Sequence, residues 1–288
     1  MKKIALHLIV AISILTFASS CKEVGPSIDF GTAENFDDTT YLLTTIPPAQ
    51  NKNALIEELT GVKCANCPVG HQLVKDLKAS YPNKIISTAN HTNFLGSPYP
   101  GNPDLRNAKA EDLISSSNYG PLTDKPSAMI DRTINPANNA YLQLKGVWSS
   151  AVAGQLSKTT PVNITIVNKF DSITRELKVK VIAQFTQTVS ENLKIVVALT
   201  ENDIVAQQLQ PDNTLLANYV HQDVLRDYLT LNIGNSLNTT TEAGRVVIRN
   251  YTTTLPADWN ANNMHAVAFV QKSVSSKEVL QVAEEKLK

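Results

Sequence analysis

The pattern of apolar and polar positions changes near residue 158. Up to that point, short apolar runs alternate with stretches in which apolar side chains recur every three or four residues. The predicted strands are residues 54–59, 85–89 and 127–131, and the predicted helices are residues 69–77, 104–115 and 140–156. The first helix carries Val69, Leu73 and Leu77 on one face. Strands that alternate with helices indicate an α/β domain with a partly parallel sheet, which we expect over residues 53–157.

Residues 158–288 follow a period of two instead. Val162, Ile164 and Ile166 alternate with polar residues. Further strands are predicted at residues 177–181, 195–199, 245–251, 266–270 and 279–282. Many short strands separated by polar turns predict an all-β domain, an antiparallel sandwich of the immunoglobulin-like kind. The run at 195–199 is unbroken by polar residues, which predicts a central strand.

The start of the chain has the layout of an export signal. A short basic start precedes a mainly apolar run at residues 4–17, and small residues lead up to Cys21. The run is too short for a membrane-spanning helix, so we expect a signal peptide over residues 1–20. Small residues directly before a cysteine resemble a bacterial lipobox, which implies cleavage before Cys21 and its acylation. Residues 21–52 would then be a lipidated stalk that tethers the protein to a membrane.

Composition excludes several classes of protein. The 26 Lys and Arg residues balance the 26 Asp and Glu residues, so the chain lacks the cationic excess of a nucleic-acid binder. A hydrophobic fraction of 42% is too high for a disordered chain. Three cysteines are too few for a disulfide-rich scaffold. Apart from Cys21, the cysteines are Cys64 and Cys67, and these two are the candidate reactive groups.

Cys64 and Cys67 lie between a predicted strand and a predicted helix, in the segment Glu-Glu-Leu-Thr-Gly-Val-Lys-Cys-Ala-Asn-Cys-Pro. Two cysteines three residues apart on one helical turn are close enough to form a disulfide. The unpaired backbone N–H groups and the dipole of a helix start favour a thiolate at Cys64. Pro68 falls in the first turn, where a missing N–H costs least. The arrangement suits thiol–disulfide exchange.

Residues 53–157 resemble the thioredoxin superfamily. The resemblance rests on the Cys-x-x-Cys motif, on Glu58 six residues before the first cysteine, and on Pro126 just before a strand. It implies that Cys64 is the exposed, attacking thiolate and that Cys67 is the resolving thiol. It further implies that Glu58 moves protons for the second cysteine, and that Pro126 is a cis-proline that contacts the substrate backbone.

A narrower resemblance covers most of the chain. Glu-Glu-Leu-Thr-Gly followed by Cys-x-x-Cys-Pro is similar to the outer membrane protein 28-related lipoproteins of Bacteroidota, as are residues 219–226 and 268–271. It implies a thioredoxin-like domain joined to a β-rich domain, anchored to the outer membrane on its periplasmic face or at the cell surface. Lys63 departs from the thioredoxin pattern, which usually has tryptophan at that position.

Two other interpretations of the cysteine pair stay open. One is a static disulfide, although a loop of about four residues gains only about 2 kcal/mol of chain entropy. The other is a copper or zinc site, because His71 lies one helical turn after Cys67 and His91 follows the second strand. An oxidised pair cannot ligate a metal as thiolate, and His91 is instead a candidate for a residue near the substrate site.

The leading hypothesis is therefore an outer-membrane lipoprotein that is a candidate thiol–disulfide oxidoreductase. It would act on protein thiols or disulfides, without cofactor, metal or nucleic acid. The alternative from another class is a surface binding or adhesion lipoprotein that uses the same fold as a scaffold. His221, Arg226 and the pair Asp131-Arg132 are expected to pack between the two domains.

Overall fold

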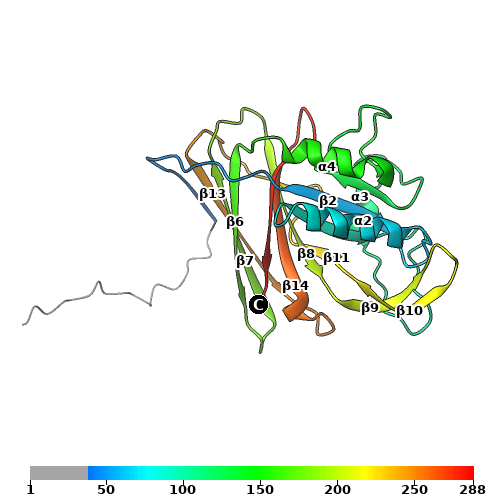
Figure 1. Ribbon diagram of the computed structural model, residues 1–288. Coiled ribbons are helices and arrows are strands. Elements are labelled where there is room, and N and C mark those ends of the chain that lie inside the picture. Colours follow the sequence, from blue (N-terminus) through cyan, green and yellow to red (C-terminus); the bar gives the residue numbers. More distant parts are fainter. Residues whose placement is uncertain (1–37) are drawn as a thin grey trace, which may run out of the picture. The chain divides into compact units, whose positions relative to one another are not determined.

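A computed structural model describes residues 38–288 (Figure 1). The signal peptide and Cys21 lie outside these residues. In the described part the fold is rich in β-structure, with two large sheets, one hairpin and short helices. The helices are α2 (Cys67–Ser80), α3 (Ala108–Leu113) and α4 (Trp148–Leu156), with 3-10 turns η1 (Lys145–Val147) and η2 (Ala261–Asn263).

The first sheet has four strands, and every pair in it is antiparallel. Its order is β1 (Thr39–Leu42), β13 (Arg245–Thr254), β7 (Glu176–Phe185) and β6 (Val162–Phe170). Along β7 the burial alternates from residue to residue, as the period of two predicts. The buried face packs against strands of the second sheet, and the two faces together form one core.

The second sheet has nine strands and contains elements from both halves of the chain. Its order is β15 (Val279–Lys286), β14 (Met264–Lys272), β8 (Leu193–Glu201), β11 (Val224–Tyr228), β3 (Ile85–His91), β2 (Ala54–Thr60), β4 (Ser127–Ile130) and β5 (Gln143–Leu144), and β12 (Asn235–Ser236) pairs with β8. β8 pairs with three strands, so the prediction that it is central is confirmed.

The predicted domain boundary after residue 157 falls between α4 and β6, but it does not divide this sheet. β11 follows that boundary in the chain and pairs in parallel with β3, with Val224 opposite Ala89. An unpaired β3 edge would leave backbone N–H and C=O groups without partners, and β11 supplies them. The two predicted halves therefore share one continuous sheet.

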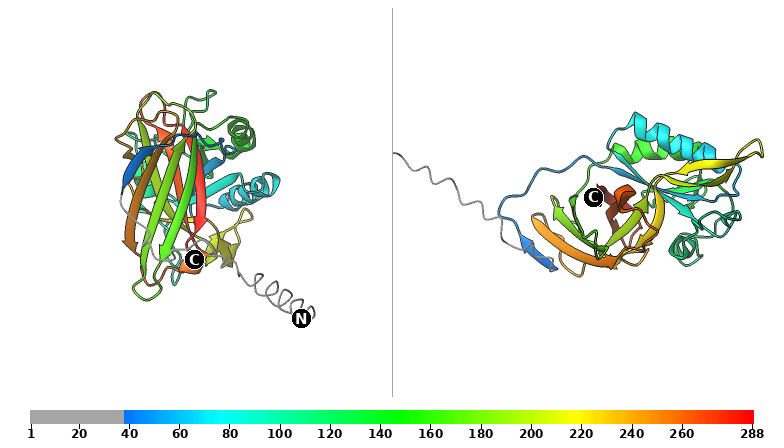
Figure 2. Two further views of the ribbon diagram at one scale, coloured as in Figure 1. Left: turned by 90° about the vertical axis from the view of Figure 1, so that its left-hand side faces the viewer. Right: turned by 90° about the horizontal axis from the view of Figure 1, so that it is seen from below.

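Helices cover the β2–β3–β4 part of the second sheet on both faces (Figure 2). α2 and α4 pack side by side against one face, in a core that includes Ile56 and Trp148. α3 packs against the other face, where Leu55 contributes to a separate core. Every residue of β2 and β3 is buried as a result, including polar ones such as Glu58, Asn90 and His91.

Several predicted elements differ from the observed ones. The helix predicted at 140–156 begins at Trp148, because residues 143–144 pair with β4 as β5 and the Trp148 indole donates to the Gln143 carbonyl at 2.9 Å. The helix predicted at 104–115 is confined to α3, which the Asn107 side chain caps by accepting from two backbone N–H groups. On α2, Val69 is exposed and the buried face carries Gly70 and Val74 instead.

The predicted stalk of residues 21–52 is folded in its second part. β1 pairs with β13, and Gln50 exchanges hydrogen bonds with Asn163 and Ile164 of β6. The stalk prediction is therefore wrong for residues 38–52, because their backbone groups find partners on the four-stranded sheet. Residues 21–37 lie outside the described part.

A buried ionic cluster connects the two halves. Arg132 is fully buried and holds both carboxylate oxygens of Glu57 at 2.7 Å. The same guanidinium donates to the Gln271 side chain of β14 and to the Asn232 carbonyl. Asp131-Arg132 thus packs between the halves, as predicted, and Glu57 faces away from the side of the sheet to which Glu58 belongs.

Candidate functional site

Cys64 and Cys67 form a disulfide at the junction of β2 and α2, with their Cα atoms 5.4 Å apart. Cys67 is the first residue of α2, and Pro68 follows in the first turn, as predicted. The Cys67 N–H donates to the Cys64 carbonyl at 3.2 Å, which closes the tight turn between them. Both residues are buried, with exposed fractions of 2% and 0%. The expectation of an exposed Cys64 is therefore wrong for this conformation.

The cover over Cys64 is a hairpin from the second half of the chain, made of β9 (Ile204–Leu209) and β10 (Leu215–His221). The Leu209 N–H donates to the Val62 carbonyl at 2.9 Å, and the Gln208 side chain donates to the Cys64 carbonyl at 3.1 Å. Gln208 itself is fully buried. The hairpin thus binds the backbone of the loop that leads into the disulfide.

Glu58 lies beneath the first turns of α2, with 3% of its surface exposed. Its Oε1 atom accepts no hydrogen bond and lies 2.7 Å from the position that a Cβ on Gly70 would take. Burial raises the pKa of Glu58 well above its usual value, the nearby Asp223 carboxylate raises it further, and the Lys125 ammonium partly opposes both. The acid form of Glu58 is therefore favoured by its surroundings.

Pro126 follows a cis peptide bond from Lys125 and meets the same helix residue as Glu58. A Cβ on Gly70 would lie 2.9 Å from the Pro126 Cβ. Glu58 and Pro126 thus come together against α2 one turn after Cys67. The sequence resemblance implied a cis-proline at this position, and the Lys125–Pro126 peptide bond is cis.

Lys125 is a buried cation that the sequence gave no reason to select. Its Nζ donates to the backbone carbonyls of Thr60 and Phe94, at the end of β2 and beside the disulfide loop. Burial lowers its pKa from 10.5 to about 7, and the charges of Glu111 and Glu58 oppose that shift. Its charge thus lies close to Glu58.

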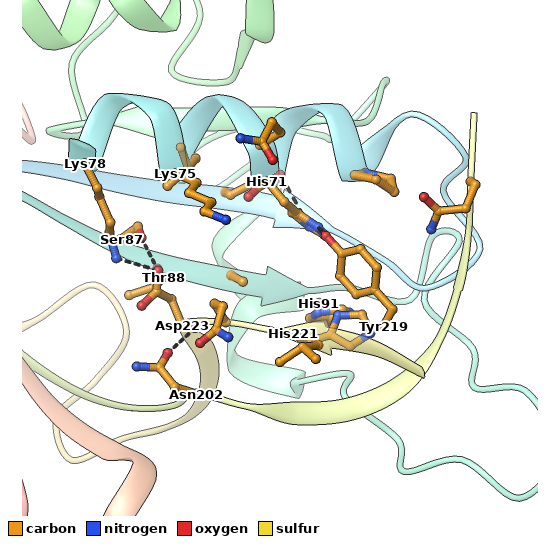
Figure 3. A pocket seen from close by; sticks show the side chains of 18 residues that line it. His71, Lys75, Lys78, Ser87, Thr88, His91, Asn202, Tyr219, His221 and Asp223 are labelled. Atoms are coloured by element: carbon orange, nitrogen blue, oxygen red, sulfur yellow. Dashed lines mark hydrogen bonds and ion pairs between the residues drawn. The ribbon is translucent and has the colours of Figure 1, made fainter. Parts of the chain in front are cut away.

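A pocket of about 710 Å³ opens between α2 and β10. Three imidazoles gather in it from three separate elements, together with Tyr219 (Figure 3). The ring centroids of His91 and His221 are 5.4 Å apart, and those of His71 and His221 are 6.4 Å apart. Glu58 and Pro68 also line this pocket, so it lies beside the disulfide turn.

His71 makes the polar contacts within this group, whereas the His221 ring contacts all three of the other rings. Its Nδ1 lies 2.6 Å from the Tyr219 hydroxyl, and its Nε2 lies 2.9 Å from the Thr60 hydroxyl and 3.6 Å from Oε1 of Glu58. Burial, and next the neighbouring His221, lower the pKa of His71 to about 3. The ring is therefore neutral at physiological pH, with one donor and one acceptor nitrogen. Tyr219 of β10 thus contacts the His71 ring from the side away from Thr60.

His91 and His221 are buried and uncharged. Their exposed fractions are 1% and 2%, and neither ring nitrogen of His91 has a hydrogen-bond partner within the described part of the protein. Burial lowers the pKa of His221 to about 4 and holds that of His91 well below its usual value. His91 lies in the same pocket as Glu58, so its predicted place near the site agrees with the structure.

The residues that the sequence did not select come from far along the chain. Tyr219 and His221 belong to the segment 219–226, which the sequence marked only as similar to the family, and nothing in the sequence pointed to Gln208.

The disulfide occupies the sulfur atoms of both Cys64 and Cys67. Across residues 38–288, no three His, Cys, Asp or Glu side chains are arranged to hold a metal ion. Over the same residues, no helix is long and apolar enough to cross a membrane.

Comparison with known proteins places the chain in a family. Residues 114–288 match the family model of outer membrane protein Omp28. The chain belongs to the Omp28 family. Its location is therefore the outer membrane. The matched residues include the hairpin and most of both sheets, whereas the disulfide turn precedes them.

Solved structures add information about the fold alone. HBP35 of Porphyromonas gingivalis is 16% identical, with a TM-score of 0.63, over 82% of this chain and 76% of that one. A domain of the outer membrane lipoprotein Omp28 from the same organism is 22% identical over 44% of this chain and 88% of that one, with a TM-score of 0.31. A protein from Agrobacterium tumefaciens is 13% identical over 83% and 97%, with a TM-score of 0.48. No curated protein matches the sequence.

Proposed function

We propose that this Omp28 family member is a thiol–disulfide exchange protein of the outer membrane, with Cys64 and Cys67 as its redox couple. The observation that carries the proposal is the meeting of Glu58 and Pro126 at Gly70, one helical turn after the Cys64–Cys67 disulfide. A buried acid beside such a pair can take the proton of the resolving thiol, and the resulting thiolate is the species that attacks a disulfide.

The first half supports a thioredoxin-like unit. β2, α2 and β3 form a parallel β-α-β unit, and β4, β5 and α4 follow as an antiparallel pair and a helix. This order of elements places the disulfide at the carboxyl end of β2 and the start of α2, where backbone N–H groups stabilise a thiolate. We assign the second half to an immunoglobulin-like sandwich that carries the covering hairpin.

The proposed reaction transfers two electrons from the reduced pair to a substrate disulfide. The Cys64 thiolate attacks one substrate sulfur, and the other substrate sulfur leaves as a thiolate. Cys67 then loses its proton to Glu58 and attacks Cys64 Sγ in the mixed disulfide. The Cys64–Cys67 bond forms, and the first substrate sulfur is released as a second thiolate. The opposite direction reverses each step.

The hairpin must move for this reaction to occur. Because Cys64 is 2% exposed, a substrate sulfur reaches it only after Gln208 and Leu209 withdraw from the loop. The proposal therefore includes a covered resting state and an open reactive state. Protein thiols or disulfides are the proposed substrates, and acylated Cys21 is the proposed membrane anchor.

The test uses the full chain with Cys21→Ser, so that the proposed couple contains all remaining thiols. We expect equilibration with glutathione buffers at a reduction potential above about −300 mV, the range of labile rather than structural disulfides. Cys67→Ser should accumulate a mixed disulfide through Cys64, and Cys64→Ser should accumulate none. A potential far below that value, with no trapped species in either variant, would exclude exchange.

The burial of both sulfurs favours a second candidate, a surface binding protein in which the disulfide is a static brace. In that case the double variant Cys64→Ser/Cys67→Ser would retain every binding property of the parent chain. Exchange instead predicts that this variant loses its function while its fold persists. A comparison of the two chains by circular dichroism and by whole-cell phenotype separates the candidates.

A further inference from the structure

A line of polar groups leads from buried Glu58 to the pocket. Oε1 of Glu58 lies 3.6 Å from Nε2 of His71. Nδ1 of the same ring lies 2.6 Å from the Tyr219 hydroxyl (Figure 3). All three residues line the pocket, but only 3% of Glu58 is exposed and its Oε1 atom is buried. Three residues from β2, α2 and β10 thus form a continuous path from the protein interior to a space that solvent can fill.

We propose that His71 and Tyr219 relay the proton that Glu58 exchanges with Cys67 to and from the pocket. This inference rests on the proposed thiol–disulfide exchange, and it adds two residues that the motif does not contain. His71 and Tyr219 act through Glu58 and do not contact the sulfurs, so they are positioning and relay residues.

Each transfer balances. In this step Glu58 as the carboxylate takes the proton of Cys67 and then gives it to Nε2 of His71, in the tautomer whose Nε2 is the acceptor. Nδ1 at the same time gives its proton to the Tyr219 oxygen, and the Tyr219 hydroxyl releases its own proton to water in the pocket. The ring stays neutral and changes tautomer. When the disulfide is reduced again, a proton enters by the reverse steps and restores the first tautomer.

The need for a relay follows from the burial of Glu58. Its acid form is favoured there, so the proton that Glu58 takes up must be removed before it can act as a base again, and Nε2 of His71 lies 3.6 Å from its Oε1. The titratable and charged groups around it come from every neighbouring element: His71 of α2, His91 of β3, Lys125 before β4, His221 of β10 and Asp223 before β11. Lys125 donates two of its three ammonium protons to backbone carbonyls.

The residues that contact the disulfide loop and the relay residue Tyr219 belong to different parts of one hairpin. Gln208 and Leu209, which cover Cys64, pair with residues 215–216 near the tip. Tyr219 pairs with Ala206 nearer the base, and the register shifts between Leu216 and Tyr219. Such a bulge interrupts the ladder and bends the strand. The tip can therefore withdraw from Cys64 while Tyr219 stays on His71.

The experiment follows the two chemical steps separately in the full chain with Cys21→Ser. The reduced protein is mixed with oxidised glutathione in a rapid-mixing instrument between pH 6 and 9. Formation of the mixed disulfide is measured alone in the Cys67→Ser background, and release of the second glutathione reports the resolving step. The variants are His71→Gln, His71→Ala and Tyr219→Phe, and the matched controls are His265→Gln and Tyr41→Phe, which lie outside the pocket.

We expect His71→Gln and Tyr219→Phe to slow the resolving step about tenfold or more and to leave the first step unchanged. A positioned acid or base typically contributes about 100-fold or more, and water replaces part of the relay. Imidazole added to His71→Ala should restore the rate, because the pocket has room for it. The controls should match the parent chain.

Each contrary result has its own meaning. If the variants resolve at the parental rate, or if both steps slow equally and imidazole restores neither, the relay is wrong while exchange stands. If the parent chain forms no mixed disulfide and releases no glutathione, the proposed exchange is wrong, and the relay falls with it. If a His71 variant misfolds, Tyr219→Phe, which removes a single hydroxyl, tests the relay instead.

Discussion

The side-chain amide of Gln208 donates to the carbonyl oxygen of Cys64 across 3.1 Å and 144 residues of sequence. This bond, with the backbone bond from Leu209 to Val62, holds the tip of the β9–β10 hairpin over the disulfide. A segment outside the α/β half therefore holds the loop that contains the cysteine pair.

Removal of this contact should make the disulfide easier to reach. In Gln208→Ala, we expect dithiothreitol to reduce the Cys64–Cys67 bond about two- to tenfold faster, because one hydrogen bond of about 0.5–1.5 kcal/mol no longer favours the closed hairpin. The rate is measured by the appearance of free thiols. Gln222→Ala, which removes an exposed glutamine beside the same hairpin, should leave the rate unchanged. Equal rates in all three chains would show that the hairpin does not limit access.

Gly70 permits the approach of Glu58 and Pro126 to α2. A methyl group there would lie 2.7 Å from the Glu58 carboxylate and 2.9 Å from Pro126. Gly70→Ala should lower the free energy of unfolding by about 1–3 kcal/mol, the usual cost of overpacking. Gly154→Ala in α4 meets no atom within 4 Å and should instead raise stability by about 0.5–1 kcal/mol. Urea titration measures both, and a stabilised Gly70→Ala would contradict the packing.

Removing one partner of the buried ion pair between Arg132 and Glu57 should strongly lower the free energy of unfolding. Arg132→Met leaves the Glu57 carboxylate buried without its partner, and we expect a loss of about 3–5 kcal/mol in the free energy of unfolding. The double variant Arg132→Met/Glu57→Gln should lose less, because the uncompensated charge is gone. Arg106→Met breaks an exposed pair with Asp104 and should cost about 1 kcal/mol or less. Similar losses for Arg132→Met and Arg106→Met would contradict this account.

Lys125 should make stability depend on pH. Its pKa is about 7 in the folded protein and 10.5 when unfolded, so between these values the unfolded chain binds more protons. The free energy of unfolding should therefore rise with pH across this interval. Lys125→Met removes that contribution, so the free energy of unfolding of the parent minus that of the variant, measured by denaturant titration at pH 6.5, 8 and 9.5, should increase as pH rises. Lys169→Met at an exposed position is the control for loss of a lysine, and a difference that does not vary with pH would contradict the burial of this cation.

Local patterns predicted the elements near the disulfide well. Short apolar runs predicted the strands β2, β3 and β4. Pro68 in the first turn predicted the start of α2 at the cysteine motif. The helix face was assigned less well, because Gly70 is buried for its small size and not for its hydrophobicity. The length of α3 and the pairing of β5 depend on Asn107 and on hydrogen bonds to β4, which no local period reports.

Within the candidate site, the chain itself determined which groups can react: a cysteine pair at a helix start, with an acid six residues before it and a proline ahead of a later strand. These follow from chemistry and spacing along a short stretch. The tertiary structure alone decided that the pair is covered, that Lys125 is buried beside Glu58, and that His71 meets Tyr219 from 148 residues away. Burial and hydrogen bonding between distant segments depend on how sheets and hairpins pack in space, and a one-dimensional pattern of residues does not contain that information.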